Sequence, residues 1–386
     1  MMQSARTYLD WNATSPLLPA AREAMLAALD IAGNPSSPHA EGRRARSVVE
    51  TARESLGAAL DVSARSLYFT SGATEAANWV LSPTQAQGRT YGVLLAGATE
   101  HACVRDGHRF ASGHVKLVPV DTEGLLDVAA LAHRVAREAD EHGAGRVLVA
   151  VQSANNETGV LQPMEAIATA VADMGGVLVC DAVQSVGRGL PLPAAPITFL
   201  SAHKLGGPKG VGAVIVRDEA LLPAPLLRGG GQERRQRSGT ENVAGIAGFA
   251  AAACAVIRDA ASFVTHTRGL QQRLEAGLKA IEPATQIFGQ KAARLSNTTC
   301  FAVPGVSSET ALVALDLAGV ALSSGSACSS GKVATSHVLA AMGVAPELAR
   351  GALRLSTGAA TTAADIDRFL GAWSQFLSRR AQRAVA

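Results

Sequence analysis

The 386-residue sequence lacks the segments that mark membrane, secreted or nucleic-acid-binding proteins. Its longest apolar stretch, Ala244 to Ile257, is too short to span a bilayer and predicts a buried helix instead. No signal peptide is recognisable, so we expect a cytoplasmic protein with no membrane partner. The net charge of +3 comes without a long Lys/Arg run, which argues against a nucleic-acid partner. The densest basic cluster, Arg234 to Arg237, is interpreted as a solvated loop or a subunit contact.

Cysteine is scarce, and its spacing excludes two common kinds of site. The five cysteines are Cys103, Cys180, Cys254, Cys300 and Cys328. They form no Cys-x-x-Cys pair, so neither a zinc site nor a redox dithiol is indicated, and we expect no metal. Cys180 in an apolar strand and Cys254 in an Ala-rich helix are interpreted as inert core thiols. Cys328 lies among small polar residues in Ser323 to Lys332, which are typical of an exposed loop. It is therefore the candidate nucleophile, with Cys103 as its rival.

The order of apolar and helical segments predicts an α/β fold. Strands alternate with helices from about residue 65 to 216, which favours a mostly parallel sheet flanked by helices. Val128 to His142 is predicted as one crossover helix, and His266 to Ile281 and Ala363 to Arg379 as later helices. We expect a large domain over residues 15–258. Residues 1–14 and 259–386 are expected to form a smaller α+β domain that carries the cysteine loop, at about 323–335.

A lysine stands at the mouth of a glycine-rich turn in the large domain. The apolar runs Ile197 to Leu200 and Val211 to Val216 read as two strands, and Ser201 to Gly210 joins them. Lys204 lies at the start of this turn. A lysine that reaches into a cleft from such a position can form a Schiff base with a carbonyl cofactor such as pyridoxal phosphate. The alternative is a solvated loop lysine, which describes most lysines.

Three further polar groups end predicted strands. The run Leu67 to Thr70 leads through Ser71-Gly72 into a helix, whose N-terminal N–H groups can cradle a phosphate. Asp181 closes a buried strand, where a carboxylate needs a partner such as a protonated pyridine nitrogen. His101 follows a third strand and can stack on a flat ring or move protons. Because the ends of parallel strands meet at one edge, we expect these groups to share a cleft.

Each of these groups also has an ordinary structural interpretation. Ser71 or Thr74 can be the N-cap of the helix that follows Gly72, and a cap alone does not indicate a phosphate site. Asp181 can likewise be a helix-capping aspartate. His101 can be a satisfied histidine at the end of a strand. The functional interpretation therefore depends on all of them occurring together with Lys204.

In order along the chain, these segments resemble the pyridoxal-phosphate-dependent cysteine desulfurases of the NifS/IscS kind, in the class-V aminotransferase superfamily. The resemblance runs from residue 8 to about 358. It rests on Tyr8-Leu9-Asp10 with Asn12-Ala13-Thr14, Gly33 to Ser37 with His39, Thr70 to Glu75, Glu100-His101, Asn155 to Gly159, Asp181 with Gln184, Ser201 to Gly210, Gly229 to Glu233 with Arg237 to Thr240, Gly325 to Cys328, and Leu353 to Ser356. It implies the fold of type I pyridoxal-phosphate transferases.

The resemblance also implies a role for individual residues. Lys204 is similar to the Schiff-base lysine, Asp181 to the partner of the pyridine nitrogen, His101 to the stacking histidine, and Gln184 to the residue near the phenolic oxygen. The positions that hold the phosphate are matched by Ala73, Thr74, Ser201 and His203. Thr240 matches a phosphate contact that this family takes from the partner subunit, which implies a homodimer.

The implied reaction converts L-cysteine to L-alanine. Asn156 and Arg354 resemble the pair that grips the substrate carboxylate, and Lys204 would remove the Cα proton. Cys328 would take the sulfur as a persulfide and pass it to an acceptor protein, such as an iron–sulfur scaffold, for cluster or thio-cofactor assembly. His101 would help to deprotonate one of the two thiols.

Departures from the family pattern leave alternatives open. Trp11 stands where the family usually has Asn, Arg228 precedes the glycine run in place of His, and Gly331 to Thr335 lack the usual Glu-Pro. The last departure puts the acceptor partner in doubt more than the chemistry. The alternatives are a selenocysteine lyase or cysteine sulfinate desulfinase, for which Cys328 matters less, an aminotransferase of the same fold, and a non-catalytic sulfur carrier.

Overall fold

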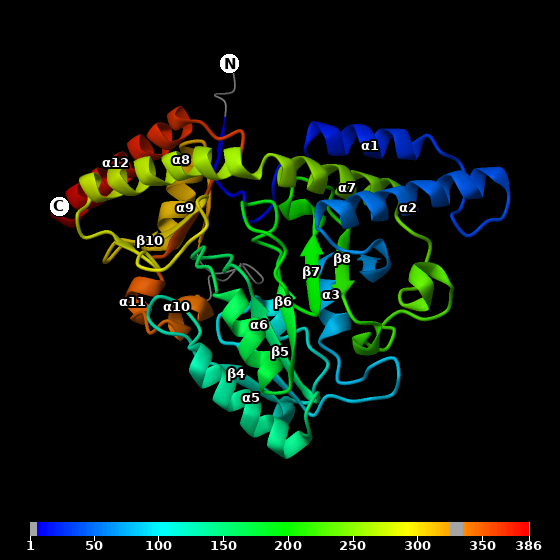
Figure 1. Ribbon diagram of the computed structural model, residues 1–386. Helices are drawn as coiled ribbons and strands as arrows, with labels where there is room; N and C mark the ends of the chain where they lie inside the picture. The colour runs from blue at the N-terminus through cyan, green and yellow to red at the C-terminus, as the bar shows by residue number, and fades with distance from the viewer. Residues whose placement is uncertain (1–5, 325–334, 386) are drawn as a thin grey trace.

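The computed structural model describes residues 6–324 and 335–385, and its centre is a seven-stranded sheet (Figure 1). The strand order is β2 (Leu67–Thr70), β8 (Gly212–Val216), β7 (Ile197–Ser201), β6 (Gly176–Asp181), β5 (Val147–Gln152), β3 (Val93–Gly97) and β4 (Val115–Val118). Strand β8 is antiparallel to its neighbours β2 and β7, and the other neighbours pair in parallel. The mostly parallel sheet predicted from the sequence is therefore confirmed.

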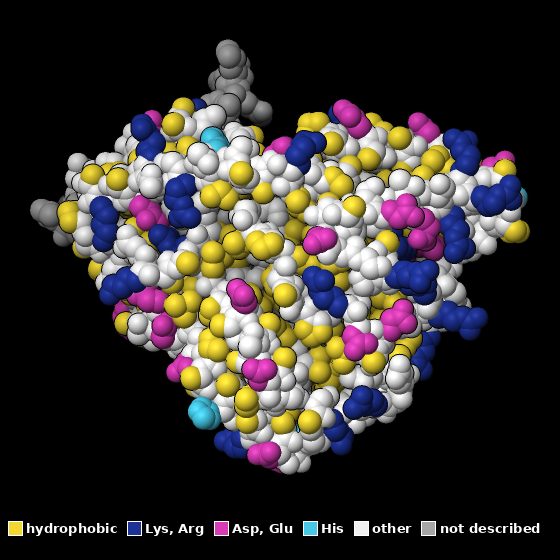
Figure 2. All heavy atoms as spheres, in the orientation of Figure 1, with side chains coloured by type: hydrophobic (Ala, Val, Ile, Leu, Met, Phe, Trp, Pro, Cys, Tyr) yellow, Lys and Arg dark blue, Asp and Glu magenta, His cyan; other side chains and the backbone are white. Residues whose placement is uncertain are grey.

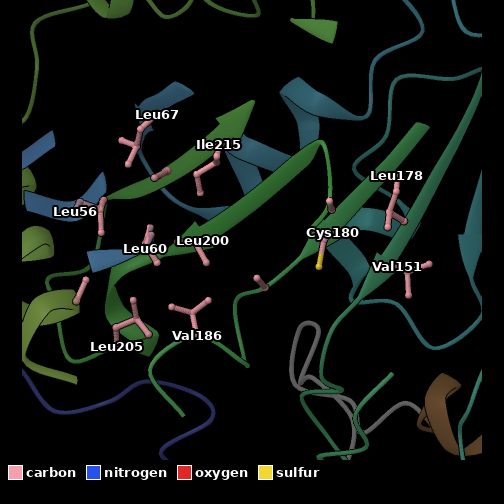
Figure 3. Packing of buried hydrophobic residues seen from close by; sticks show 14 of the residues in the cluster. Leu56, Leu60, Leu67, Val151, Leu178, Cys180, Val186, Leu200, Leu205 and Ile215 are labelled. Carbon is pink, nitrogen blue, oxygen red and sulfur yellow. The ribbon is translucent and has the colours of Figure 1, made fainter. Parts of the chain in front are cut away.

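Helices cover both faces of this sheet because its strands are apolar on both sides. In β5, Val147, Val149 and Val151 belong to one core cluster, and Leu148 and Ala150 belong to the other. The first cluster packs under α2 (Ala40–Ala59), α5 (Val128–His142), α6 (Met164–Asp173) and α7 (Val243–Arg258), and Figure 3 shows part of it. The second packs under α3 (Ala73–Val80) and α4 (Ala102–Arg105). Burial on both sides explains the continuous apolar runs in the sequence.

The C-terminal part of the chain forms a second, antiparallel sheet. Its strands in order are β12 (Ser323–Ser324), β13 (Leu353–Ser356), β10 (Thr298–Ala302) and β9 (Gln286–Ile287). Strand β1 (Thr7–Tyr8) pairs in parallel with β11 (Val320–Ala321), so the N-terminal segment joins this part. The helices here are α8 (Ala260–Ile281), α9 (Ser308–Leu317), α10 (His337–Ala341), α11 (Pro346–Ala349) and α12 (Ala363–Val385).

A separate core holds this second part together. Phe301 of β10 and Trp373 of α12 meet edge to face, with ring centroids 5.6 Å apart. Both belong to a buried cluster that also includes Leu9, from the N-terminal segment, and Leu274 of α8. Helices α8 and α12 lie side by side in Figure 1. The arrangement supports the α+β character expected for this part, and the domain limits 15–258 and 259–386 stay a prediction.

The helices predicted from periodicity are present. The helix α5 has the predicted limits, α8 begins at Ala260 rather than at His266, and α12 extends beyond Arg379 to Val385. The apolar stretch Ala244 to Ile257 lies within α7, against which α1 (Pro19–Leu29) and α2 pack. Within the described residues no single helix is long and apolar enough to cross a bilayer; α7 and α8 meet such a test only as a pair bent by 70°.

The basic cluster after the glycine run is not a freely solvated loop. Glu233, Arg234 and Arg235 have φ angles of 45°, 54° and 68°, in the left-handed region that side chains disfavour. The Glu233 carboxylate accepts two hydrogen bonds from Arg53, at 2.7 and 2.8 Å, and one from the Phe69 N–H, at 2.8 Å. The guanidinium of Arg234 lies 4.1 Å from the centre of the Tyr68 ring.

These contacts stabilise the left-handed backbone of residues 233–235 and hold this loop against strand β2. Arg237 is likewise paired, with Glu75 of α3 at 2.9 Å. On the face seen in Figure 2, the Lys and Arg side chains lie scattered among Asp and Glu side chains, without a continuous basic surface.

The buried Arg53–Glu233 pair gives a test of this anchoring. Glu233→Gln leaves the Arg53 guanidinium buried without its carboxylate, and we expect the free energy of unfolding to fall by about 3 kcal/mol. Chemical denaturation measures this change. Glu50→Gln is the matched control, because Glu50 contacts the same Arg53 at 3.1 Å but is 47% exposed. Its removal is expected to cost less than about 1 kcal/mol. Equal effects of the two variants would contradict the anchoring role.

Candidate active site

One cavity of about 800 Å³ opens at the carboxyl ends of the parallel strands, between the two sheets. All of the predicted site residues except Thr240 and Cys328 line it: Ala73, Thr74, His101, Asn156, Asp181, Gln184, Ser201, His203, Lys204 and Arg354. The parallel strands explain this convergence, since β3, β6 and β7 end at the same edge. Arg354 comes from β13 of the second sheet, so both parts of the chain contribute to the site.

Lys204 lies in a short 3₁₀ turn directly after β7, and its amine faces backbone carbonyls. Its Nζ donates to the oxygen of Asn12 at 2.6 Å and to that of Ala13 at 2.9 Å. Burial and, to a smaller extent, the guanidinium charges of Arg354 and Arg188 together lower the pKa of Lys204 to about 7. A considerable share of Lys204 is therefore a neutral amine near pH 7, and this is the form that attacks a carbonyl carbon.

Asp181 ends strand β6 and is almost fully buried. Burial raises the pKa of Asp181 to about 6, against the opposing effects of a hydrogen bond from the Val183 N–H, at 2.9 Å, and of the Lys204 charge. The residues that follow form turns, so the interpretation of Asp181 as a helix-capping residue is wrong. A buried carboxylate in this position favours a cationic ring nitrogen as its partner.

His101 begins the short helix α4 and lies beside the cavity as a neutral ring. Its Nδ1 accepts a hydrogen bond from the Cys103 N–H at 3.1 Å, which leaves the proton of the neutral ring on Nε2. Burial lowers the pKa of His101, and the charges of Lys204 and His337 lower it further. His203 behaves similarly, since burial lowers its pKa to about 4. A flat, uncharged ring suits stacking on another ring.

Cys103 also lines the cavity, but its thiol is a poor nucleophile. Burial raises the pKa of Cys103, and the neighbouring carboxyl groups of Asp181 and Glu100 raise it further. Only the thiolate attacks sulfur well, so this environment weakens Cys103 as a rival of Cys328. Cys254, predicted as a core thiol, is only partly buried and donates to the Ser55 oxygen at 3.6 Å, so the prediction is wrong for this residue.

The N-terminus of α3 is open toward the cavity. Its N-cap is Gly72, which makes no side-chain cap and has a φ of 155°, so neither Ser71 nor Thr74 caps the helix as the alternative interpretation proposed. A Cβ placed on Gly72 would meet nothing within 4 Å. Glu75 instead accepts the Ser71 N–H at 3.0 Å and is held by Arg237. Uncapped N–H groups of a helix N-terminus favour a phosphate.

Arg354 is held on two sides and keeps further N–H donors. Its Nη1 donates to the Asn156 oxygen at 3.0 Å, and its Nη2 donates to Asp10 Oδ1 at 2.7 Å. Among the described residues, its buried Nε has no hydrogen-bond partner. Arg354 and Asn156 both line the cavity, and a guanidinium beside an amide suits a carboxylate. Asp10 was not predicted as part of the site.

Asn12 connects the two parts of the site, and sequence reasoning assigned it no role. Its backbone oxygen accepts Lys204 Nζ and, at 3.1 Å, Gln184 Nε2. Its Nδ2 donates to Thr298 Oγ1 at 2.9 Å and to the Asn156 oxygen at 3.2 Å. The signal in the sequence is the segment Asn12-Ala13-Thr14, which is one of those that carry the resemblance.

Two predicted residues remain, Thr240 and Cys328. Thr240 is exposed and lines a neighbouring cavity of about 200 Å³, beyond Ser71 and Gly210. Its contribution to a partner subunit stays a prediction. Cys328 lies outside the described residues. Close to the two borders of the residues left undescribed, Ser323 Oγ donates to Asp10 Oδ2 at 2.7 Å, and Ser336 Oγ donates to Glu157 Oε2 at 2.5 Å.

The cavity fits a planar group that carries a phosphate, a carbonyl carbon and a basic ring nitrogen. The uncapped start of α3 suits the phosphate, Lys204 the carbonyl carbon, Asp181 the ring nitrogen and His101 the face of the ring. Pyridoxal phosphate has these groups, so the residues present fit the cofactor predicted from the sequence.

Comparison with known proteins agrees with this geometry. Residues 7–369 match the family model of the class-V aminotransferases. A cysteine desulfurase of Cereibacter sphaeroides is 39% identical, over 95% of this chain and 94% of that protein. An IscS-like cysteine desulfurase of Mycobacterium tuberculosis is 35% identical over 98% of both chains. The X-ray structure of a NifS-like protein from Rickettsia africae, 32% identical, aligns with a TM-score of 0.87 over 97% of this chain and 99% of that one. The chain therefore belongs to the class-V aminotransferase family and, within it, to the cysteine desulfurases.

Proposed function

We propose that this protein converts L-cysteine to L-alanine with pyridoxal phosphate as cofactor and passes the sulfur on as a persulfide of Cys328. The observation that carries the proposal is the placement of Lys204, Asp181, the open start of α3 and Arg354 around one cavity. A lysine with a pKa of about 7 opposite a buried carboxylate is the pairing that amine chemistry on a carbonyl cofactor requires. The cysteine desulfurase relatives supply the substrate class.

The predicted residues of the cavity divide the binding of the cofactor among them in this proposal. Ala73, Thr74, Ser201 and His203 hold the phosphate, and Gln184 contacts the phenolic oxygen. Asp181 keeps the ring nitrogen protonated, and His101 stacks on the ring. When bound, pyridoxal phosphate supplies an electron sink for negative charge that develops at the substrate Cα.

The substrate is held and deprotonated by the chain itself. Arg354 and Asn156 bind its carboxylate, which orients the Cα–H bond toward Lys204. The neutral Lys204 amine accepts the Cα proton. The Cys328 thiolate then attacks the substrate Sγ: an S–S bond forms, the Cβ–Sγ bond breaks with its electron pair left on carbon, a proton is added at Cβ, and Lys204 returns its proton to Cα to give alanine.

The sulfur on Cys328 then needs an acceptor. We propose an acceptor protein such as an iron–sulfur scaffold, and a homodimer in which Thr240 completes the phosphate site of the partner subunit. The exposed position of Thr240, one cavity away from the phosphate-binding end of α3, supports this arrangement.

Removing the acceptor thiol separates the two halves of the reaction. We expect Cys328→Ala to bind the cofactor normally but to form no persulfide from L-cysteine, because none of the four described cysteines offers an exposed, low-pKa thiol near the site. Persulfide trapping and alanine assays measure the loss. Cys103→Ala is the matched control and is expected to keep most of the activity. Normal sulfide release by Cys328→Ala would contradict the assignment and favour a selenocysteine lyase or a cysteine sulfinate desulfinase.

The lowered pKa of Lys204 predicts how the apoprotein takes up its cofactor. The reacting form is the neutral amine, so the rate of pyridoxal phosphate uptake is expected to rise with pH through about 7 and then to level off. Stopped-flow absorbance measures the rate, with Nα-acetyl-lysine as the reference amine and Lys204→Ala as the blank. A midpoint near that of the reference amine would contradict the buried environment. No uptake at any pH would favour the non-catalytic sulfur carrier.

Arg354 predicts a defect in substrate binding. Arg354→Lys keeps the charge but cannot hold Asp10, Asn156 and a carboxylate at the same time. We expect KM for L-cysteine to rise at least about tenfold, which corresponds to the loss of one charged hydrogen bond. Steady-state kinetics checks this. Arg273→Lys, which alters an exposed pair with Asp367, is the control and should leave KM unchanged. An unchanged KM in Arg354→Lys would remove Arg354 from the substrate site.

A further inference from the structure

Arg188 differs from the other buried arginines of this protein. It follows β6 in a turn segment, and only 6% of its surface is exposed. Arg53 pairs with Glu233, Arg294 with Glu275 and Arg354 with Asp10. Within residues 6–324 and 335–385, Arg188 has no carboxylate within ion-pair distance. A buried cation without a counter-charge costs several kcal/mol, so its place next to the active-site cavity calls for an explanation.

All hydrogen bonds of Arg188 go to neutral oxygens of the site. Its Nη1 donates to Asn12 Oδ1 at 2.7 Å and to Gln184 Oε1, and its Nη2 contacts the Trp11 oxygen at 3.5 Å. A guanidinium only donates, so it fixes which end of each amide faces it. Gln184 must present Oε1 to Arg188, and its Nε2 is thereby available as a donor; it contacts the Asn12 oxygen at 3.1 Å.

The same contacts bring the charge of Arg188 close to Lys204. Both side chains bind Asn12, Arg188 at the side-chain oxygen and Lys204 at the backbone oxygen. Burial lowers the pKa of Arg188 to about 9, with Arg354 contributing, so Arg188 stays charged at neutral pH. The charged and titratable groups that act on Lys204 or respond to it are Arg188, Arg354, Asp10, Asp181, His101, His203 and Cys103.

Among these groups the two guanidinium charges have the larger effects on Lys204: Arg354 and Arg188 each lower its pKa by more than Asp10 or Asp181 raises it. Asp10 is itself paired with Arg354. The histidines are neutral because burial lowers their pKa values. The charge of Arg188 therefore disfavours an ammonium at Lys204 and favours an anionic oxygen beside Gln184.

We propose that Arg188 is a positioning residue of the reaction: it fixes the amides of Gln184 and Asn12 and provides the positive charge that favours a neutral Lys204 and an anionic oxygen on the bound group. The part about the anionic oxygen rests on the proposed function, because that function supplies the bound group that carries the oxygen. The parts about the two amides and about Lys204 concern the apoprotein alone.

The test compares Arg188→Met, which removes the charge, with Arg188→Lys, which keeps it. In the apoprotein, the extent of Lys204 acetylation by acetic anhydride is measured by mass spectrometry across a pH series. We expect the midpoint to rise by about one pH unit in Arg188→Met and to stay close to wild type in Arg188→Lys. Arg294→Met is the matched control: it removes another little-exposed arginine, leaves Glu275 unpaired, and should leave the midpoint unchanged.

The effect of Arg188 on the bound group is tested by spectroscopy on the cofactor-loaded protein, without L-cysteine. The absorbance of the bound cofactor is titrated with pH, and its midpoint should shift upward in Arg188→Met but not in Arg294→Met. If Arg188→Met does not fold, Arg188→Gln replaces it, because glutamine keeps N–H donors toward Asn12 and Gln184 without the charge.

The outcomes separate this inference from the proposed function. An unchanged Lys204 midpoint in a folded, uncharged Arg188 variant would overturn the inference. An equal shift in Arg294→Met would overturn it as well, since it would show a general effect of instability. If the wild-type protein does not bind pyridoxal phosphate, the proposed function fails, and the acetylation series still decides the role of Arg188.

Discussion

The N-terminal segment is the constraint on which the site depends, because it is hydrogen-bonded to both sheets. Asn12 accepts the Lys204 amine and the Gln184 amide from the large sheet's side of the cavity. Asn12 also binds the second sheet: its backbone N–H donates to Ser356 Oγ at 2.9 Å, and its Nδ2 donates to Thr298 Oγ1. Two sheets with separate cores are thus held at a fixed distance by one buried asparagine whose polar groups are paired. Such a network fixes geometry because any shift would leave a buried polar atom unpaired.

Burial, rather than any single ion pair, sets the electrostatics of the cavity. The same loss of solvent that lowers the pKa of Lys204 raises that of Asp181 and lowers that of His101. Each of the three groups is therefore shifted toward its neutral form, which is the less costly state where solvent is lost. A ligand that brings a ring cation and an anionic phosphate reverses this balance. The ring cation stabilises the ionised form of Asp181, and this stabilisation becomes part of the binding free energy of that ligand.

The sequence was sufficient for those features that depend on local pattern. Helix α5 has the limits predicted from its periodicity, and the strand-end positions of Asp181 and Lys204 followed from apolar runs that end in polar residues. Contacts between distant segments were not predictable. Nothing local to Asn12 indicates that it contacts residues 144 and 286 positions away, and nothing in Glu233 indicates its left-handed backbone, which persists because Arg53 and Phe69 bind its carboxylate.

The hydrogen bonds around Arg354 join the predicted substrate site to the segment that carries Cys328, the proposed sulfur acceptor. Arg354 binds Asp10, and the other oxygen of this carboxylate accepts Ser323, just before residues 325–334. On the other side of that segment, Ser336 binds Glu157, the neighbour of Asn156. Burial raises the pKa of Glu157 to about 7, so this contact is sensitive to the local charge, including that of Arg354. A carboxylate at the predicted substrate site would bind the same guanidinium that holds Asp10 and Asn156. The borders of the cysteine segment and the predicted substrate site therefore share one set of hydrogen bonds.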